Sequence, residues 1–231
     1  MLKITNLKKS YKQKVVLDGL NFKLKQKTIK ALIGVNGAGK STLIELICGV
    51  KKFNEGSILI NGIDSSDKKN AKTLKYTFGY MPQSFCLYND LTVRENLEYL
   101  TSIYKIDVDV TSLIKTCNLE EHEMTLAGNL SGGYKQLLSL AGALVHSPEL
   151  LILDEPTSAM DPIFRRKFWH IIKDYNKKGK TVLVITHYLE ELLECQSFAC
   201  LSKGKISYDG NVSEFKKEGF VNIEEVLKKF S

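Results

Sequence analysis

The fold is decided by one stretch of the sequence, Gly34-Val35-Asn36-Gly37-Ala38-Gly39-Lys40-Ser41. It matches, at every fixed position, the phosphate-binding loop pattern in which Gly, any four residues and Gly-Lys precede Ser or Thr. Residues 31–33 before it are apolar, as in a buried strand, and residues 42–47 after it have a helical pattern. Because this strand, loop and helix order is the context that the motif requires, we expect a site for nucleotide phosphates.

The residues of this loop suit the chemistry of a bound triphosphate. Gly37 and Gly39 let the backbone approach an anion because they have no Cβ. The N–H groups of the loop and of the first helical turn then point at phosphate oxygens. We expect Lys40 to reach the β- and γ-phosphates and the Ser41 hydroxyl to bind Mg²⁺. The alternative, a glycine-rich turn that binds nothing, is disfavoured by the flanking strand and helix.

Composition argues against several other classes of protein. The chain has 231 residues, 43% of them apolar, which is enough for one large domain or two small ones. The lysines behind the net charge of +7 are spread along the chain, which indicates a solvated surface and no nucleic-acid partner. The five cysteines lack a C-x-x-C pattern, so we expect reduced thiols, and the four histidines lack metal-ligand spacing. The N-terminus does not resemble a signal peptide and no run of about 20 apolar residues occurs, so we expect any membrane role to come through a partner.

The pattern of apolar residues predicts alternating strands and helices. Short strands are expected within residues 2–33, a later strand ends at an Asn61-Gly62 turn, and another strand is expected over residues 76–81. Residues 150–153 and 182–185 are continuous apolar runs, typical of central strands in a parallel sheet. We therefore predict an α/β core with a parallel sheet.

A helical segment interrupts this pattern over residues 86–130. Thr92 with Glu95 three residues later forms the capping-box pattern of a helix start. Ser131 can cap a further helix over residues 131–146, and the two glycines after it leave the helix N-terminus open to an anion. Toward the C-terminus we expect helices over residues 162–178, 188–196 and from Val212 onward, and a hairpin over residues 198–208 that turns at Lys203-Gly204.

Two acidic residues follow the first central strand. A parallel strand places such residues at its C-terminal edge, where α/β sheets bind ligands. We expect Asp154 to help hold Mg²⁺ and Glu155 to polarise the water that attacks the γ-phosphate. Acids after a strand usually just begin a loop, but beside a phosphate-binding loop they favour a nucleoside triphosphatase.

Together these motifs resemble those of the nucleotide-binding subunits of ATP-binding-cassette (ABC) transporters. The matches follow the family order over essentially the whole chain: Tyr11, the phosphate loop, Gln83, Leu130-Ser131-Gly132-Gly133, Asp154-Glu155-Pro156-Thr157-Ser158 with Ala159-Met160-Asp161-Pro162, and His187. The resemblance implies a P-loop NTPase core with a mostly parallel sheet, an N-terminal antiparallel β subdomain and an inserted α-helical subdomain. It further implies one ABC ATPase domain over residues 1–231. Residues 1–85 and 147–231 would form its core and β subdomain, and residues 86–146 its helical subdomain with the signature motif.

The resemblance also implies ATP and Mg²⁺ as cofactors and gives each motif a role. The implied catalytic residues are Glu155, His187, Lys40 and Gln83. The implied Mg²⁺ ligands are Ser41, Gln83 and Asp154. The implied nucleotide contacts are Tyr11, Asn36, Gly37, Ala38, Gly39, Lys40, Ser41, Thr42, Ser131, Gly132, Gly133 and Asp161.

In this family two such domains pair head to tail around two ATP molecules. Ser131 and Gly133 would then contact the γ-phosphate that the opposite copy holds, and we expect a homodimer. Residues 92–97 and 158–162 look most like the ABC-2 type exporters, a group that includes drug-resistance ATPases. The resemblance thus implies a subunit that hydrolyses ATP to drive export through a separate polytopic membrane subunit, at the cytoplasmic face of the cell membrane.

Two other functions stay open. A soluble ABC ATPase acting on ribosomes or DNA fits poorly, because the chain has one cassette and no heptad insertion. A regulatory subunit with low turnover is opposed by Glu155 and His187. It is favoured by Leu137 and Gly142, which stand where the family's signature helix usually has arginines. Gly142 is also expected to cost its helix about 1 kcal/mol relative to alanine.

Overall fold

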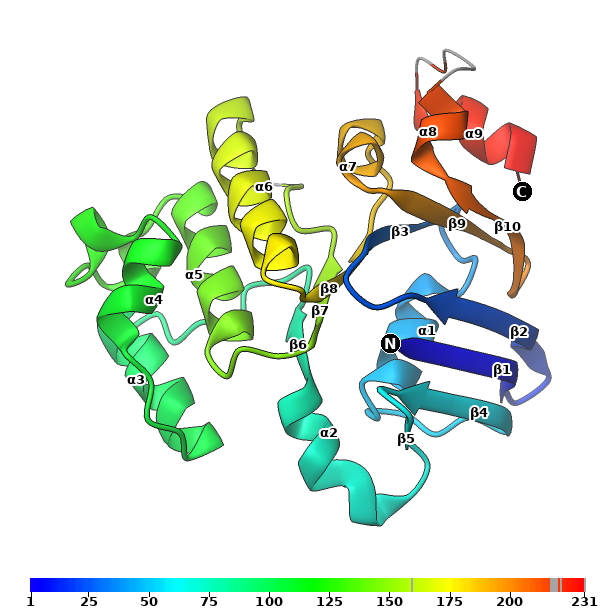
Figure 1. The fold of residues 1–231 in the computed structure, drawn as a ribbon, viewed down its shortest axis with the longest axis horizontal. Coiled ribbons are helices and arrows are strands. Elements are labelled where there is room, and N and C mark those ends of the chain that lie inside the picture. Colours follow the sequence, from blue (N-terminus) through cyan, green and yellow to red (C-terminus); the bar gives the residue numbers. More distant parts are fainter. Residues whose placement is uncertain (159, 217–219, 221, 231) are drawn as a thin grey trace.

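Residues 1–158, 160–216, 220 and 222–230 are described by a computed structural model. They form two β-sheets with helices packed around them (Figure 1). One sheet has four strands in the order β2-β1-β4-β5, and the other has six in the order β10-β9-β3-β8-β7-β6. The predicted α/β class is confirmed. Over the described ranges, no helix has both the length and the apolar character needed to cross a bilayer.

The six-stranded sheet carries the site. Its strands are β3 (Ile29–Ile33), β6 (Phe78–Met81), β7 (Leu150–Asp154), β8 (Thr181–Ile185), β9 (Ser197–Ser202) and β10 (Lys205–Asn211). They are parallel to one another except β10, which returns antiparallel to β9 after a turn at Lys203 and Gly204. Every residue of β3 and β8 is buried, which explains their almost unbroken apolar sequences.

The smaller sheet is antiparallel and N-terminal. Its strands are β1 (Leu2–Tyr11), β2 (Lys14–Leu24), β4 (Glu55–Ile60) and β5 (Ile63–Asp64). Asn61 and Gly62, with φ of 52° and 82°, form the turn between β4 and β5. Two residues of positive φ are what a tight hairpin turn demands, so the Asn-Gly prediction is confirmed.

Helices cover both faces of the six-stranded sheet. The helices of the described residues are α1 (Lys40–Ile47), α2 (Ala71–Thr77), α3 (Val93–Tyr104), α4 (Val110–Thr116), α5 (Gly132–Leu144), α6 (Pro162–Lys177), α7 (Leu189–Glu194), α8 (Val212–Lys216) and α9 (Ile223–Phe230), with 3-10 turns at Lys68–Asn70, Glu120–His122 and Ala127–Asn129. On one face, α1 and the small sheet share a core with residues such as Leu150 and Ile152. On the other face, α5, α6 and α7 share a core with the alternate residues Leu151 and Leu153. The phosphate-loop helix is thus clamped between two sheets.

Helices α3, α4 and α5 gather on one side of the molecule (Figure 1). The predicted capping box of α3 is present: Glu95 N–H donates to the Thr92 hydroxyl at 3.2 Å, and Thr92 N–H donates to the Glu95 carboxylate at 2.8 Å. Gly142 lets α5 approach α3, because a Cβ there would lie 2.9 Å from Leu100 Cδ1. Leu137 is fully buried in the apolar core. Both departures from the family pattern are therefore accommodated by packing.

One strand prediction was wrong at its start. Tyr76 and Thr77, predicted to begin a strand, are the last residues of α2. The Tyr76 hydroxyl donates to the carbonyl oxygen of Tyr104 at 2.7 Å, and β6 pairs with β7 only from Phe78 onward. Contacts distant in sequence therefore outweigh the strand preference of these two residues. The tail is helical in α8 and α9, while residues 217–219, 221 and 231 lie outside the described residues.

We predict that Gly79→Ala strongly destabilises the fold. A Cβ on Gly79 would lie 2.1 Å from the carbonyl oxygen of Ala143 and 2.9 Å from Pro148 Cγ, so β6 would be forced away from the end of α5. Overpacking against backbone should lower the free energy of unfolding by about 3 kcal/mol, measured by urea titration.

The matched control is Gly49→Ala. No atom would lie within 4 Å of the added Cβ, and only the positive φ of 72° opposes alanine, at a cost of about 1 kcal/mol. Equal losses in the two variants would contradict this account of the contact between β6 and α5.

Candidate nucleotide-binding site

The phosphate loop connects β3 to α1. Gly37 and Gly39 have φ of 79° and 109°, in the left-handed region that glycine adopts without strain. A Cβ on Gly39 would also lie 2.9 Å from Leu17 Cδ2. The first turn of α1 has no acidic residue, so the positive end of the helix is left for an anion. The loop thus has the backbone that the sequence motif predicts.

Lys40 is held at the mouth of this loop. Its ammonium donates to the carbonyl oxygens of Gly34 at 2.7 Å and Val35 at 3.3 Å. Burial lowers the pKa of Lys40, and the carboxylates of Glu155 and Asp154 act in the opposite direction. A phosphate would supply the negative charge that this partly buried cation lacks.

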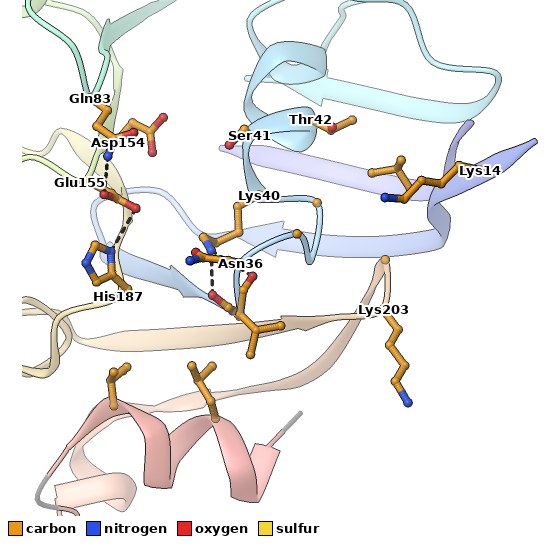
Figure 2. A pocket seen from close by; sticks show the side chains of 18 of the residues that line it. Lys14, Asn36, Lys40, Ser41, Thr42, Gln83, Asp154, Glu155, His187 and Lys203 are labelled. Carbon is orange, nitrogen blue, oxygen red and sulfur yellow. Dashed lines mark hydrogen bonds and ion pairs between the residues drawn. The ribbon is translucent and has the colours of Figure 1, made fainter. Parts of the chain in front are cut away.

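Glu155 contacts two other residues that the sequence predicted to be catalytic, Gln83 and His187. Its carboxylate accepts a hydrogen bond from Gln83 Nε2 at 2.7 Å through one oxygen, and its other oxygen lies 3.0 Å from His187 Nδ1 (Figure 2). Glu155 has φ of 48°, which costs about 1 kcal/mol or more for a residue other than glycine. Its backbone N–H donates to the carbonyl oxygen of Ile185 at 2.9 Å. The strained turn therefore aims the carboxylate at the loop after β8.

Asp154 lies at the carboxyl end of β7, one residue before Glu155. It accepts a hydrogen bond from the Tyr80 hydroxyl at 3.3 Å. Burial raises the pKa of Asp154, and the negative charge of Glu155 adds to the rise, whereas Tyr80 and Lys40 oppose it. A cation beside this carboxylate would favour its ionised form.

A cavity of about 1000 Å³ joins these groups. The predicted residues that line it are Tyr11, Asn36, Gly37, Gly39, Lys40, Ser41, Thr42, Gln83, Asp154, Glu155 and His187. Ala38 is buried, with 5% of its surface exposed, and does not line the cavity. Lys14 and Lys203 lie at the opposite end of the site from the cluster of Gln83, Glu155 and His187 (Figure 2). The cavity therefore has a basic end with the two lysines and an opposite end with the Glu155 carboxylate and its partners.

Sequence reasoning missed part of the cavity wall. The hairpin residues Lys14, Val15, Val16, Lys203 and Gly204 line it, together with Ile223, Glu224 and Leu227 from α9. The Lys203-Gly204 turn was predicted as a turn but not as part of the site. No local signal could reveal these residues, because only the tertiary fold brings α9 beside the phosphate loop.

The signature residues lie outside this cavity. Ser131 is the exposed N-cap residue of α5, without a side-chain capping bond. Gly133 is packed against α6, since a Cβ there would lie 2.6 Å from the ring of Phe164. Asp161 caps α6 by accepting hydrogen bonds from the N–H groups of Ile163 at 2.8 Å and Phe164 at 3.0 Å. The predicted contacts Ser131, Gly132, Gly133 and Asp161 therefore form a second patch, and Ala159 beside it lies outside the described residues.

The cavity offers oxygen ligands of the kind that Mg²⁺ prefers. They are the Ser41 hydroxyl, the Asp154 carboxylate and the Gln83 amide, whose nitrogen donates to Glu155 and whose oxygen could serve as a ligand atom. Within the described part of the chain, no group of three or more His, Cys, Asp or Glu could hold a metal alone. This donor set fits Mg²⁺, which commonly takes one or two carboxylates and completes its shell with phosphates and water.

The chain belongs to the ABC transporter family, whose model matches residues 17–158, more than half of the sequence. It is 33% identical over 223 residues to the probable multidrug ABC transporter ATP-binding protein YbhF of Escherichia coli (strain K12), covering 94% of this chain and 38% of that protein. It is 34% identical over 212 residues to the linearmycin resistance ATP-binding protein LnrL of Bacillus subtilis (strain 168), covering 89% and 68%. It is 35% identical over 221 residues to the methionine import ATP-binding protein MetN 1 of Oenococcus oeni, covering 91% and 63%. The chain thus spans well under half of YbhF and about two thirds of the other two.

Solved structures agree with this assignment. The fold superposes with a TM-score of 0.87 on an ATP binding subunit of an ABC transporter, 28% identical, over 100% of this chain and 99% of that chain. The TM-score is 0.82 with a dimeric post-hydrolysis state of the cassette MJ0796 bound to ADP and Pi, 27% identical, over 92% and 99%. The chain is therefore an ABC ATPase domain, and the resemblance derived from its motifs is confirmed.

We predict that Tyr11→Ala weakens ATP binding about ten-fold or more, while Tyr11→Phe leaves it within two-fold. Tyr11 lies at the cavity edge with 38% of its surface exposed. An aromatic face there can stack on adenine, and such stacking contributes about 1–3 kcal/mol per base. Titration with a fluorescent ATP analogue measures both affinities. Parental affinity in Tyr11→Ala would contradict a stacking role.

Proposed function

We propose that this chain binds and hydrolyses ATP as the motor subunit of a membrane transporter, most similar to the ABC-2 type exporters. One observation carries the proposal: the Glu155 carboxylate is contacted by Gln83 Nε2 at 2.7 Å and by His187 Nδ1 at 3.0 Å, beside the phosphate loop. A subunit that only binds nucleotide does not need a carboxylate whose two oxygens are each held by another side chain. The intact set also argues against a regulatory subunit of low turnover.

The site orients ATP along the cavity. The adenine ring stacks on Tyr11 at one end, and the N-terminus of α1 with Lys40 meets the charge of the β- and γ-phosphates. Ser41, Asp154 and Gln83 would hold Mg²⁺, which would supply positive charge to the phosphates and polarise the γ-phosphoryl group. The γ-phosphate then lies beside Glu155 and His187, at the acidic end of the cavity.

Glu155 is the general base in this proposal. It accepts the proton of the attacking water while the water oxygen bonds to the γ-phosphorus and the bond to the ADP oxygen breaks. His187 Nδ1 and Gln83 Nε2 hold one carboxylate oxygen each. The other ring nitrogen of His187, Nε2, does not contact Glu155 and can bond the γ-phosphate. His187 would then hold both the base and the substrate in position.

The second patch completes the site of another copy. Ser131 and Gly132 are exposed at the N-terminus of α5, where an anion could bind, but Ser131, Gly132 and Gly133 do not line the cavity of their own chain. We propose a head-to-tail homodimer in which this patch meets the γ-phosphate held by the partner and Asp161 lies at the interface. The fold is similar to that of the cassette MJ0796, which is dimeric, and this similarity supports a dimer.

A groove near the site suits the membrane subunit. It has a volume of about 670 Å³ and is lined by the end of α1, by α2 and by aromatic residues that include Phe78, Tyr80 and Tyr104. Tyr80 also bonds Asp154, so one side chain joins the groove to the nucleotide cavity. We propose that a separate polytopic membrane subunit docks a cytoplasmic segment here, and that nucleic acid is not a partner. The ATPase then works at the cytoplasmic face of the membrane.

Export is the proposed direction because YbhF and LnrL are named for multidrug transport and resistance. Import is the second candidate, favoured by the similarity to MetN 1, which is named for methionine import. Vesicles containing the assembled transporter distinguish the two, since ATP on the outside of inside-out vesicles drives accumulation only by an exporter.

We predict that Glu155→Gln lowers kcat for ATP hydrolysis at least 100-fold and leaves ATP affinity within three-fold. The amide keeps the shape of the side chain but cannot accept the proton of water. Phosphate release and nucleotide titration measure the two quantities. Glu149→Gln, an exposed residue paired with Lys180, is the matched control and keeps parental kcat. A parental kcat in Glu155→Gln would contradict the assignment of Glu155 as the general base.

We predict that Ala71→Arg abolishes capture of the membrane subunit from native membranes without changing the basal ATPase rate. Ala71 is exposed on α2 and lines the groove, so an arginine there fills it. Thr73→Arg adds the same side chain to an exposed α2 residue outside the groove and keeps the partner. Recovery of ribosomes or nucleoprotein instead of a polytopic membrane protein would favour the soluble class and overturn the transporter proposal.

A further inference from the structure

Glu191 is a carboxylate buried without an obvious reason. It lies on α7, with 0% of its surface exposed. One carboxylate oxygen accepts hydrogen bonds from the backbone N–H of Thr157, at 3.1 Å, and from the Thr157 hydroxyl. Among the residues that the structure describes, the other oxygen has no hydrogen-bond partner. Glu191 does not line the nucleotide cavity, so it has no direct part in the chemistry.

Burial of the Glu191 carboxylate is unfavourable for the stability of the fold, so stability alone does not explain this residue. Burial raises the pKa of this carboxyl, and the hydroxyls of Thr157 and Thr186, the backbone N–H of Thr157 and the charge of Arg165 oppose the rise. Arg165 itself has a buried Nε for which the described part of the chain supplies no hydrogen-bond partner. Well-packed apolar residues are often at least as stable as buried ionic groups with incomplete partners. A positional role would account for a carboxylate here.

The position of Glu191 connects the two catalytic loops. Thr157, its hydrogen-bond partner, lies two residues after Glu155, whose backbone is in the left-handed region. Glu191 itself lies four residues after His187, on the helix that this loop enters. Both loops therefore run from the contact between Glu155 and His187 back to a single buried contact between Thr157 and Glu191.

We propose that Glu191 is a positioning residue for ATP hydrolysis: by binding Thr157, it fixes the turn of Glu155 relative to the loop of His187. This inference rests on the proposed function, because it concerns the geometry of the proposed base. Without the contact, the strained turn at Glu155 is free to relax and the carboxylate loses its alignment with His187. ATP binding is unaffected, since the phosphate loop is on a different strand.

Steady-state kinetics of the full chain test this proposal. We expect Glu191→Ala to lower kcat at least ten-fold with KM for ATP within two-fold. Glu191→Gln should restore most of kcat, because its amide oxygen still accepts from Thr157 N–H. Glu190→Ala, an exposed neighbour on α7, is the control and keeps parental kcat. Thr157→Val removes the hydroxyl partner from the opposite side and should also lower kcat, which keeps the test decisive if Glu191→Ala does not fold.

A second readout does not depend on turnover. The chain has four histidines, so the imidazole NMR signals of His187 can be assigned by single substitutions. We expect Glu155→Gln to shift them, Glu191→Ala and Thr157→Val to shift them in the same direction, and Glu190→Ala to leave them in place. This readout decides the positioning role even if the parent chain does not hydrolyse ATP, a result that would by itself defeat the proposed function.

The outcomes separate the two ideas. If Glu155→Gln abolishes hydrolysis while folded Glu191→Ala and Thr157→Val keep parental kcat and unshifted His187 signals, the positioning role is overturned and the proposed function stands. If Glu191→Gln is as impaired as Glu191→Ala and KM rises in both, Glu191 supports the fold and not the alignment, and the proposal is likewise overturned.

Discussion

Parallel pairing of β3, β8 and β7 is the constraint on which the rest of the site depends. In this pairing Leu32 and Asp154 both lie opposite Ile185, so the three strands end at the same level of the sheet. The phosphate loop, the Glu155 turn and the His187 loop are the continuations of these chains. Residues more than 100 positions apart in the sequence thus meet at one edge, with no long-range loop needed to bring them there. The buried apolar sequences of the strands hold this edge in place, since each strand face packs into one of the two cores.

The edge collects charged groups that are unfavourable there in the absence of ligand. The pKa of Lys40 is lowered and that of Asp154 is raised, in both cases chiefly by burial. The positive φ of Glu155 adds backbone strain at the same edge of the sheet. Such groups are stabilised when phosphate and a divalent cation supply the missing charges, so ligand binding relieves a cost that the fold already carries. Nucleotide with a divalent cation is therefore expected to stabilise this edge of the sheet.

The sequence predicted those features whose chemistry lies in contiguous residues. The phosphate loop, the α3 capping box and the Asn61-Gly62 turn each depend on neighbours within a few positions, and each is present as expected. The α/β class followed from the apolar runs. Prediction failed where distant contacts decide: Tyr76 belongs to α2 because it bonds Tyr104. The α9 residues on the cavity wall and the contact of Glu191 with Thr157 have no local signature at all. The roles of Ser131 and Gly133 stay predictions, because a single chain separates them from the cavity.

The central claim is that each copy holds only half of a catalytic site, and sedimentation with nucleotide tests it most directly. We expect the Glu155→Gln chain to bind ATP without hydrolysing it, so that its mass in ATP and Mg²⁺ reports on the ATP-bound state alone. Our account predicts a shift from monomer to dimer on adding ATP, none with ADP, and none when Gly132→Asp places a negative charge at an exposed position in the first turn of α5. A chain that binds ATP tightly, confirmed in the same sample by nucleotide absorbance, yet sediments as a monomer at every protein concentration would contradict it.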